Sequence, residues 1–361
     1  MKLKIGITFR DDQELGQTWY GSGLSQNLKF LYDLLELLGH EVSFVVNTDQ
    51  WTTLNHGNAT YRVTTRESVF NQTSRLDVLV EAGMNLNELE CTQLRDSLGV
   101  KVVSLRYGHV FYMDVEGIFT AENLPANLHT ARPDMVWTSP HFSGTLSYLS
   151  TLYDAPARVS PYIWEPDFVE TRLHHVGRVE KPSIYVMEPN ISVLKNALIP
   201  MAVLENVFRS APDSFDKGYI LNSMHFYQKE LFLTNIAARF SSLQGGNEKV
   251  YFSPRDSFSN VFKRPDILLG HQHECELNYL YNEALYTGVP LVHNSPAYKD
   301  LGYYYHENNV EEGAESLTGA INSYVPEEHR IQNETFLQSF SIRDTRVQEQ
   351  HALLLEELMD L

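Results

Sequence analysis

A polar turn between Gly270 and Leu277 separates a short apolar strand from a helix in the segment DILLGHQHECELNYLYNEALYTGVPLVHNSP. Such a turn directs backbone N–H groups and the positive end of the helix dipole toward the space above the strand end, which suits a diphosphate. Glu276, Leu277 and Asn278 stand at the expected helix start. Glu283 follows about two turns later, where it could accept hydrogen bonds from ribose hydroxyls or remain a surface carboxylate.

Two histidines in this segment, His271 and His273, have the alternate spacing of metal ligands. No third or fourth ligand follows at a useful spacing, so we expect no metal site. His271, at the strand end, is expected to hydrogen-bond a bound nucleotide. His293 ends the next strand and could do the same, although a core or surface histidine is the alternative for both.

A second polar group follows an apolar strand at Glu188, in the sequence EPNIS. Asn190 and Ser192 could hydrogen-bond a ligand or cap the next helix. Lys195 is expected in the first turns of that helix, where its ammonium could neutralise phosphate charge. We expect this group, Glu188 included, to lie beside a bound ligand.

Two weaker candidates lie elsewhere. Arg255 follows another short strand and could reach a phosphate or pair with Asp256. Gly21, Ser22 and Gly23 precede an expected helix and could let the backbone approach a ligand, although a lone GxG occurs in any tight loop.

The elements that position these residues alternate between strand and helix in two successive blocks. In the first block we expect strands over Leu3–Phe9, Glu41–Val46, Asp77–Glu81, Lys101–Leu105 and Asp134–Thr138, and helices over Leu24–Leu38, Leu86–Leu98 and Phe142–Tyr153. In the second block we expect strands over Ser183–Glu188, Tyr219–Leu221, Lys249–Phe252, Asp266–Leu269 and Pro290–His293, and helices over Ser192–Arg209, Gln228–Ser241, Leu277–Thr287, Val310–Tyr324 and Arg343–Leu358.

This pattern predicts an α/β protein with two doubly wound, Rossmann-like domains. The proline-rich segment Ala155–Pro182 is expected to connect them. We place the domains at residues 1–165 and 166–340, and a final helix at 341–361 that could cross back to the first domain.

Composition and charge agree with a two-domain enzyme. The chain has 361 residues, 43% hydrophobic residues, two cysteines, and 28 Lys+Arg against 46 Asp+Glu, for a net charge of −18. No apolar run approaches the roughly 20 residues of a membrane span, and the N-terminus lacks the pattern of a signal peptide. We therefore expect a cytoplasmic protein whose charge opposes nonspecific binding of nucleic acid.

The segment EALYTGVPLV, which contains Glu283, resembles the donor-binding helix of glycosyltransferases with the GT-B fold, in which two Rossmann-like domains face across a cleft. In that superfamily the glutamate before Ala-Leu holds the ribose of a nucleotide-sugar. Retaining members often carry another glutamate eight residues earlier, where this chain has Cys275 between Glu274 and Glu276. The resemblance therefore leaves inverting and retaining mechanisms open.

A closer resemblance covers nearly the whole chain. Six segments are similar, in order, to family 2827 of the bacterial domains of unknown function, which is regarded as glycosyltransferase-like: GQTWYGSGLSQN from Gly16, YMDVE from Tyr112, VWTSP from Val136, PYIWEP from Pro161, MEPNIS from Met187 and LNYLY from Leu277. The resemblance implies that the second domain binds a UDP- or GDP-linked sugar, that the first binds the acceptor, and that no cofactor or metal is needed.

An inverting transfer needs a base for the acceptor hydroxyl. Asp114 is the first candidate, Glu116 the second and His109 the third. We expect them in a loop that follows a strand of the first domain, although a solvated loop carboxylate is the alternative for each.

Several functions stay compatible with these residues. The default is transfer to a bacterial surface glycan. The alternatives are a phage DNA glycosyltransferase acting on a hydroxymethylated base, a nucleotide-sugar epimerase, and a non-catalytic nucleotide- or sugar-binding protein. The sequence does not indicate an oligomeric state.

Overall fold

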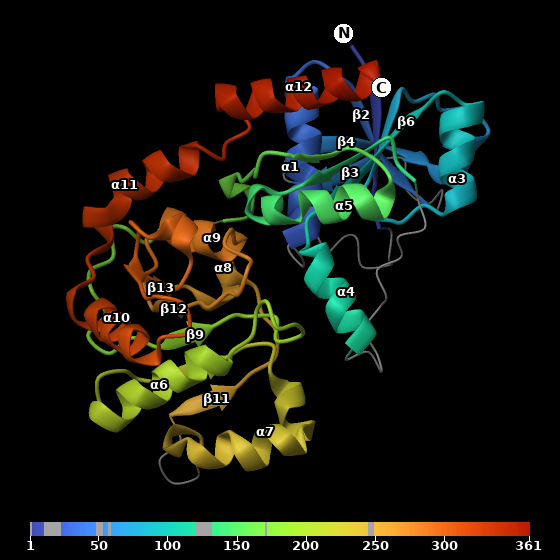
Figure 1. Cartoon of the computed structure of the whole chain (residues 1–361). Helices are drawn as coiled ribbons and strands as arrows, with labels where there is room; N and C mark the ends of the chain where they lie inside the picture. Colours follow the sequence, from blue (N-terminus) through green and yellow to red (C-terminus); the bar gives the residue numbers. More distant parts are fainter. Residues whose placement is uncertain are drawn as a thin grey trace. The chain divides into compact units, whose positions relative to one another are not determined.

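A computed structural model describes residues 2–10, 23–47, 53–56, 59–119, 132–169, 172–244 and 249–361 (Figure 1). The chain divides into two compact units. Unit 1 comprises Met1–Glu165 together with Ser339–Leu361, and unit 2 comprises Pro166–Gln338. The end of the chain therefore belongs to the same unit as its beginning.

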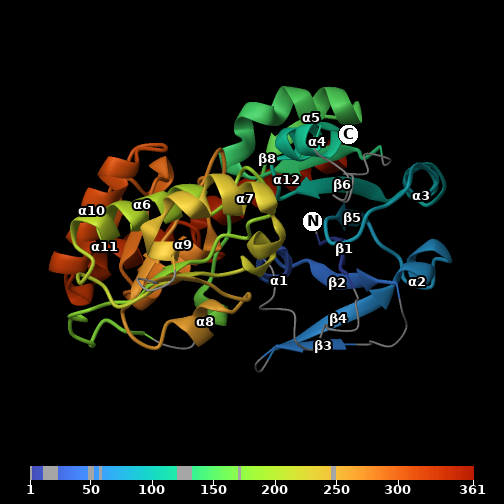
Figure 2. The ribbon, with the colours of Figure 1, turned by 90° about the horizontal axis from the view of Figure 1, so that it is seen from below.

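Unit 1 is built on an eight-stranded sheet with the order β3-β4-β2-β1-β5-β6-β7-β8, whose strands Figure 2 shows from below. Its strands are β1 (Lys4–Thr8), β2 (Glu41–Val46), β3 (Thr53–His56), β4 (Ala59–Thr65), β5 (Val78–Glu81), β6 (Lys101–Arg106), β7 (Met135–Thr138) and β8 (Ala157–Val159). Neighbours pair in parallel except β3 and β4, which form an antiparallel pair. The interior strands β1, β5 and β7 are short, mostly apolar runs that are buried almost throughout, as a parallel sheet covered on both faces requires.

The helices of unit 1 include one from the end of the chain. They are α1 (Gly23–Leu37), α2 (Arg66–Phe70), α3 (Glu88–Thr92) with a π-helical turn at Gln93–Ser97, α4 (Val110–Phe119), a 3-10 turn at Pro140–Thr145, α5 (Leu146–Tyr153) and α12 (Thr345–Asp360). Asp344 caps α12 by accepting the N–H of Arg346. Within unit 1, Arg158 pairs with Glu357 of α12, and Ser160 Oγ lies 3.2 Å from His351 Nε2.

Unit 2 has a six-stranded parallel sheet with the order β11-β10-β9-β12-β13-β14. Its strands are β9 (Ile184–Val186), β10 (Gly218–Ile220), β11 (Val250–Phe252), β12 (Ile267–Leu269), β13 (Leu291–His293) and β14 (Tyr303–Tyr304). The helices are α6 (Leu198–Ser210), α7 (Glu230–Asn235), α8 (Phe258–Val261), α9 (Tyr279–Thr287), α10 (Val310–Ser323) and α11 (Pro326–Gln338). Further 3-10 turns lie at Pro166–Phe168, Met224–Gln228, Ala237–Arg239, Ser241–Leu243 and Pro296–Tyr298.

The strand order of unit 2 reverses at its centre. From β9 the chain moves outward to β10 and β11, then returns to β12 on the other side of β9 and continues to β13 and β14. In an open parallel sheet this reversal leaves a crevice at the carboxyl ends of the two central strands. The ends of β9 and β12 are therefore the switch point of unit 2, which is where sheets of this kind commonly bind ligands.

The α/β class and the two parallel sheets are confirmed, but several elements differ from the prediction. The pair β3 and β4 was not predicted, and β8 lies within the expected connecting segment. The helix expected at Gln228–Ser241 is short and broken, since the carboxylate of Glu205 accepts the N–H groups of Ser241 and Ser242 and holds the chain in turns. No helix among the described residues is both long and apolar enough to cross a membrane.

Candidate functional site

Glu188 is the first polar residue after β9, and its side chain is only 2% exposed. One carboxylate oxygen, Oε1, accepts the N–H of His271 at 3.0 Å, so the side chain joins the ends of β9 and β12. The other oxygen, Oε2, is buried and has no hydrogen-bond partner among the described residues. Burial raises the pKa of Glu188 to about 7, against the opposing effects of the Lys195 charge and the His271 hydrogen bond.

Gly270 occupies the end of β12 because no larger residue fits there. A Cβ at this position would lie 2.5 Å from Cε1 of Tyr281, whose ring is buried beneath the turn. The Tyr281 hydroxyl is buried without a hydrogen-bond partner in the described part of the chain. Two buried polar atoms at the switch point, one on Glu188 and one on Tyr281, therefore have no partner among the described residues.

His271 lies at the switch point, as expected, and is held in one tautomer. The Tyr305 hydroxyl donates to the carbonyl of Gly270 at 3.1 Å, so the His271 Nδ1 that lies 2.9 Å from this hydroxyl must carry a proton. Burial lowers the pKa of His271 to about 4. The ring is therefore neutral at physiological pH.

His293 has a structural environment instead. Its Nδ1 accepts the N–H of Ser295 at 3.1 Å, and its Nε2 lies 2.9 Å from the carbonyl of Leu301. The side chain is completely buried, and burial lowers its pKa to about 4. Because both ring nitrogens bond to the backbone, the structure corrects the expectation that His293 contacts a donor.

The turn before α9 uses three of its N–H groups internally. Those of Gln272, His273 and Cys275 bond to Asn294, to the carbonyl of Leu194 and to the Gln272 side chain. Asn278 caps α9 by accepting the N–H of Leu280 at 3.2 Å, so the helix begins at Tyr279.

The other N–H groups of this turn remain for an anion. The backbone N–H groups of Glu276 and Leu277 have no acceptor within the described residues, and both residues are half-buried. The N–H groups of Glu274 and Asn278 likewise have no acceptor within the described residues, so the turn leaves four such groups before α9. Glu283 is the fifth residue of α9, one turn rather than two from its start, and is 6% exposed.

Asn190 has a structural role in the segment after β9. Its backbone is left-handed, with φ of 57°, and its amide donates to the carbonyls of Glu188 and Leu221 at 3.0 Å each. Its Oδ1 accepts the N–H of Ala197 at 2.8 Å. These bonds hold residues 190–197 in a loop, so α6 begins at Leu198 rather than at residue 192.

Ser192 and Lys195 consequently lie in this loop and not in the first turns of a helix. The Ser192 hydroxyl accepts the N–H of Leu194 at 3.1 Å, and Ser192 forms a β-bridge with Lys195. Lys195 is half-buried, and its charge lowers the pKa of Glu188. Lys195 therefore remains a cation near the switch point.

Arg255 is farther from the switch point. It is exposed and follows β11, two strands away from β9, which corresponds to about 10 Å. Gly21 and Ser22 lie outside the described residues, and Gly23 is the first residue of α1. In the part of the chain that the structure describes, no group of three or more His, Cys, Asp or Glu side chains could hold a metal ion.

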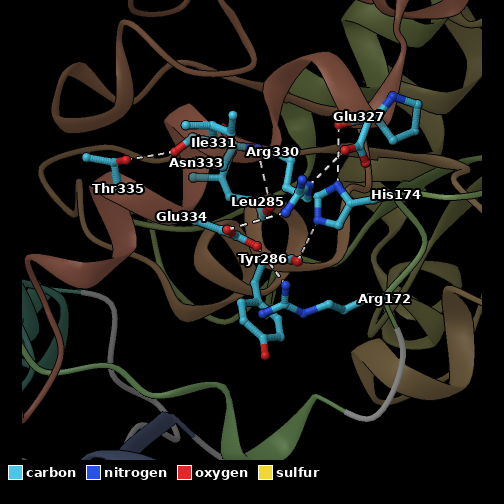
Figure 3. A network of polar contacts seen from close by, with 11 residues as sticks. Arg172, His174, Leu285, Tyr286, Glu327, Arg330, Ile331, Asn333, Glu334 and Thr335 are labelled. Carbon is cyan, nitrogen blue, oxygen red and sulfur yellow. Dashed lines mark hydrogen bonds and ion pairs between the residues drawn. The ribbon is translucent and has the colours of Figure 1, made fainter.

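The end of α9 is fixed by a polar network within unit 2 (Figure 3). The guanidinium of Arg172 lies 4.1 Å from the centre of the Tyr286 ring and bonds to Glu334 at 2.6 Å. His174 Nε2 lies 3.0 Å from the carbonyl of Tyr286, and Asn333 donates to that of Leu285 at 3.2 Å. The network ties α9 to α11, so the helix at the switch point is firmly positioned.

The candidate bases of unit 1 lie on or beside a helix, which corrects the expected loop. Asp114 and Glu116 belong to α4, and His109 directly precedes it. Tyr148 donates to Asp114 Oδ2 at 2.6 Å, and Glu116 is buried. Residues that are two positions apart in a helix lie about 200° apart around its axis. Asp114 and Glu116 therefore cannot face one ligand together.

Sequence reasoning missed a buried ion pair at the carboxyl ends of β5 and β6. Arg106 Nη2 lies 3.1 Å from Glu81 Oε2, which also accepts the hydroxyl of Ser104 at 2.7 Å. Glu81 Oε1 accepts the N–H of Leu86 at 3.0 Å. The available signal was a charged residue at the end of each of two apolar strands, DVLVE and KVVSLR.

Comparisons with known proteins agree on the architecture. A family model described as "Protein of unknown function (DUF2827)" matches residues 5–355. No curated protein matches the sequence. Among solved structures, sucrose-phosphate synthase from Thermosynechococcus elongatus has a TM-score of 0.58 at 11% identity, covering 99% of this chain and 100% of its own.

Two further structures share the fold over nearly full length. The Anabaena protein HepE, in complex with UDP and glucose, has a TM-score of 0.59 at 12% identity and covers 98% of this chain and 99% of its own. An α-glucosyltransferase in complex with UDP and DNA containing an HMU base has a TM-score of 0.55 at 13% identity, covering 98% and 100%. The fold is that of the GT-B glycosyltransferases.

Proposed function

This chain belongs to the family described as "Protein of unknown function (DUF2827)", and we propose that it is a glycosyltransferase that moves a sugar from a nucleotide-sugar to an acceptor hydroxyl. The observation that carries the proposal is the crevice of unit 2. There the unbonded N–H groups of Glu276 and Leu277 and the ammonium of Lys195 offer positive charge to a diphosphate. Neutral His271 offers a hydrogen bond to the donor, and Glu283 offers acceptors to ribose.

The proposal assigns the donor to unit 2 and the acceptor to unit 1, with Asp114 as the base. Leaving-group stabilisation by N–H groups and Lys195 requires no metal, so we expect transfer to persist in EDTA. UDP is the favoured nucleotide because two structures with this fold were solved with it. A bacterial surface glycan is the default acceptor, since a net charge of −18 repels DNA.

Mass spectrometry after incubation with a panel of nucleotide-sugars tests the function. We expect release of nucleotide, as transfer or slow hydrolysis, with at least one UDP-sugar. An isomerised nucleotide-sugar would identify an epimerase, and binding without turnover would identify a binding protein. Adding duplex DNA that contains a hydroxymethylated base tests the DNA acceptor, and a mass increase of the DNA would replace the glycan assignment.

Replacing Glu283 with Ala should weaken nucleotide binding by about 1–3 kcal/mol, because the ribose hydroxyls lose a carboxylate acceptor. Calorimetric titration with the nucleotide that binds wild type measures the change. Glu311→Ala, at an exposed carboxylate in the first turn of α10, is the matched control and should bind as wild type does. Unchanged affinity in Glu283→Ala would remove Glu283 from the donor site.

A further inference from the structure

The carboxyl group of Glu188 has protonatable and charged neighbours on every side. Lys195 approaches from the loop after β9, His271 from the turn after β12, Tyr281 from α9, and Tyr305 from the segment after β14. Burial and the nearby Glu188 carboxylate both raise the pKa values of Tyr281 and Tyr305. The side chains of Glu188, Lys195, Tyr281 and Tyr305, together with the backbone N–H of His271, therefore form one electrostatic cluster at the switch point.

The hydrogen bonds of Glu188 determine where it can hold a proton. Oε1 is occupied as the acceptor of the His271 N–H, and Oε2 is buried with no partner in the described part of the chain. A neutral carboxyl would keep the His271 bond on Oε1 and carry its proton on Oε2. An ionised carboxyl would bury a charge that has one hydrogen bond and the half-buried Lys195 for compensation.

We propose, on the basis of the proposed function, that Glu188 takes up a proton when the negatively charged diphosphate of a nucleotide-sugar binds at the ends of β9 and β12. A new negative charge beside a buried carboxylate disfavours the ionised form. The same diphosphate would compete with Glu188 for the charge of Lys195. Both effects favour the neutral carboxyl.

The protonation states of the other buried groups single out Glu188. Its pKa is raised to about 7 by burial, so about half of the Glu188 carboxyl groups carry a proton at pH 7. Burial lowers the pKa of His271 to about 4, and burial raises those of Tyr281 and Tyr305, so these three are uncharged at pH 7. A diphosphate that raises the pKa of Glu188 further converts the remaining carboxylate to the acid.

The linkage fixes the sign of the pH dependence. Binding is favoured by the protonated form, so affinity is highest below pH 7 and falls as pH rises through 7 toward the pKa of the complex. The fall amounts to about tenfold for each unit by which the diphosphate raises the pKa of Glu188. Glu188→Gln mimics the neutral acid, so its affinity should not change between pH 6 and pH 8 from this source.

Isothermal titration calorimetry of the full chain tests the inference. The titrants are UDP-glucose, UDP-N-acetylglucosamine and GDP-mannose, chosen because the diphosphates of these nucleotide-sugars do not titrate near neutral pH. Each is titrated at pH 7 in PIPES and in imidazole, two buffers whose ionisation enthalpies differ. Wild type should take up as much as about half a proton per bound donor. Glu188→Gln should lose that uptake and still bind.

Glu205→Gln is the matched control. Glu205 is also a buried glutamate of unit 2, but the hydrogen bonds from Ser241, Ser242 and Arg209 outweigh its burial and lower its pKa. This variant should keep the wild-type uptake. Binding without buffer-dependent heat, or uptake that persists in Glu188→Gln, overturns the inference and leaves the glycosyltransferase assignment in place. Failure of every donor to bind wild type overturns both.

Discussion

Replacing Asp114 with Asn is expected to lower sugar transfer by roughly two to four powers of ten, because the amide keeps the size of the carboxylate but cannot accept a proton at neutral pH. The hydroxyl of Tyr148, 2.6 Å from Oδ2, still has an oxygen to bond in the variant, so the fold should be unaffected. Donor affinity should stay near the wild-type value, because Asp114 belongs to unit 1. Steady-state kinetics and donor titration on the same preparations measure both quantities.

The control for this prediction is Glu116→Gln on the same helix. Because Glu116 is buried and about 200° around α4 from Asp114, its amide variant should transfer sugar normally. A full transfer rate in Asp114→Asn, together with a loss of transfer in Glu116→Gln, would assign the base to Glu116 instead. Normal transfer by both variants would place the base outside α4 and favour a retaining mechanism without an enzymic base.

The strands were predictable because a short apolar run bounded by polar residues must be buried, and a strand of a parallel sheet covered on both faces buries it. Glu41–Val46 appears with the predicted bounds, and the central strands differ from prediction at their ends. The pair β3 and β4 has no apolar run, since it is rich in Thr, Asn and His, and its pairing depends on contact with β2. Such tertiary pairing leaves little periodic signal in a single sequence.

The location of the crevice in unit 2 was predictable for the same reason. Glu188 and Gly270 each end an apolar run, and parallel strands bring their carboxyl ends to one edge. The bonding of the loops was not predictable. Asn190 reaches the carbonyl of Leu221, 31 residues away in sequence, and this contact displaces the start of α6. No local pattern distinguishes that asparagine from a helix cap.

Histidine roles show the same limit. His271 and His293 each end a strand of the same sheet, so the sequence makes them equivalent. They differ in which partners surround the ring: the side chains of Tyr305 and Asn308 for His271, and two backbone groups, including the carbonyl of Leu301, for His293. Only the three-dimensional path of residues 294–308 decides which groups meet each ring.

Arg106→Met should destabilise unit 1 by about 3–5 kcal/mol, because it leaves the Glu81 carboxylate buried without its cation. Glu81 is completely buried and would retain only its hydrogen bonds from Ser104 and Leu86. Urea unfolding, followed by a probe in unit 1, measures the loss. The double variant Glu81→Gln/Arg106→Met should recover part of the stability, since the amide carries no charge to bury.

The exposed ion pair between Arg158 and Glu357 provides the contrast within the same unit. Its two side chains are 44% and 39% exposed, so solvent already screens their charges and Arg158→Met should cost no more than about 1 kcal/mol. Equal losses in Arg106→Met and Arg158→Met would contradict the prediction, because the difference in burial would then have no energetic consequence. The guanidinium of Arg106 also lies 5.4 Å from the centre of the Tyr153 ring, so Arg106→Met removes packing as well as charge. A large loss of stability in Arg106→Met alone, partly reversed by Glu81→Gln, would establish that the cost arises from the unpaired charge rather than from the lost packing.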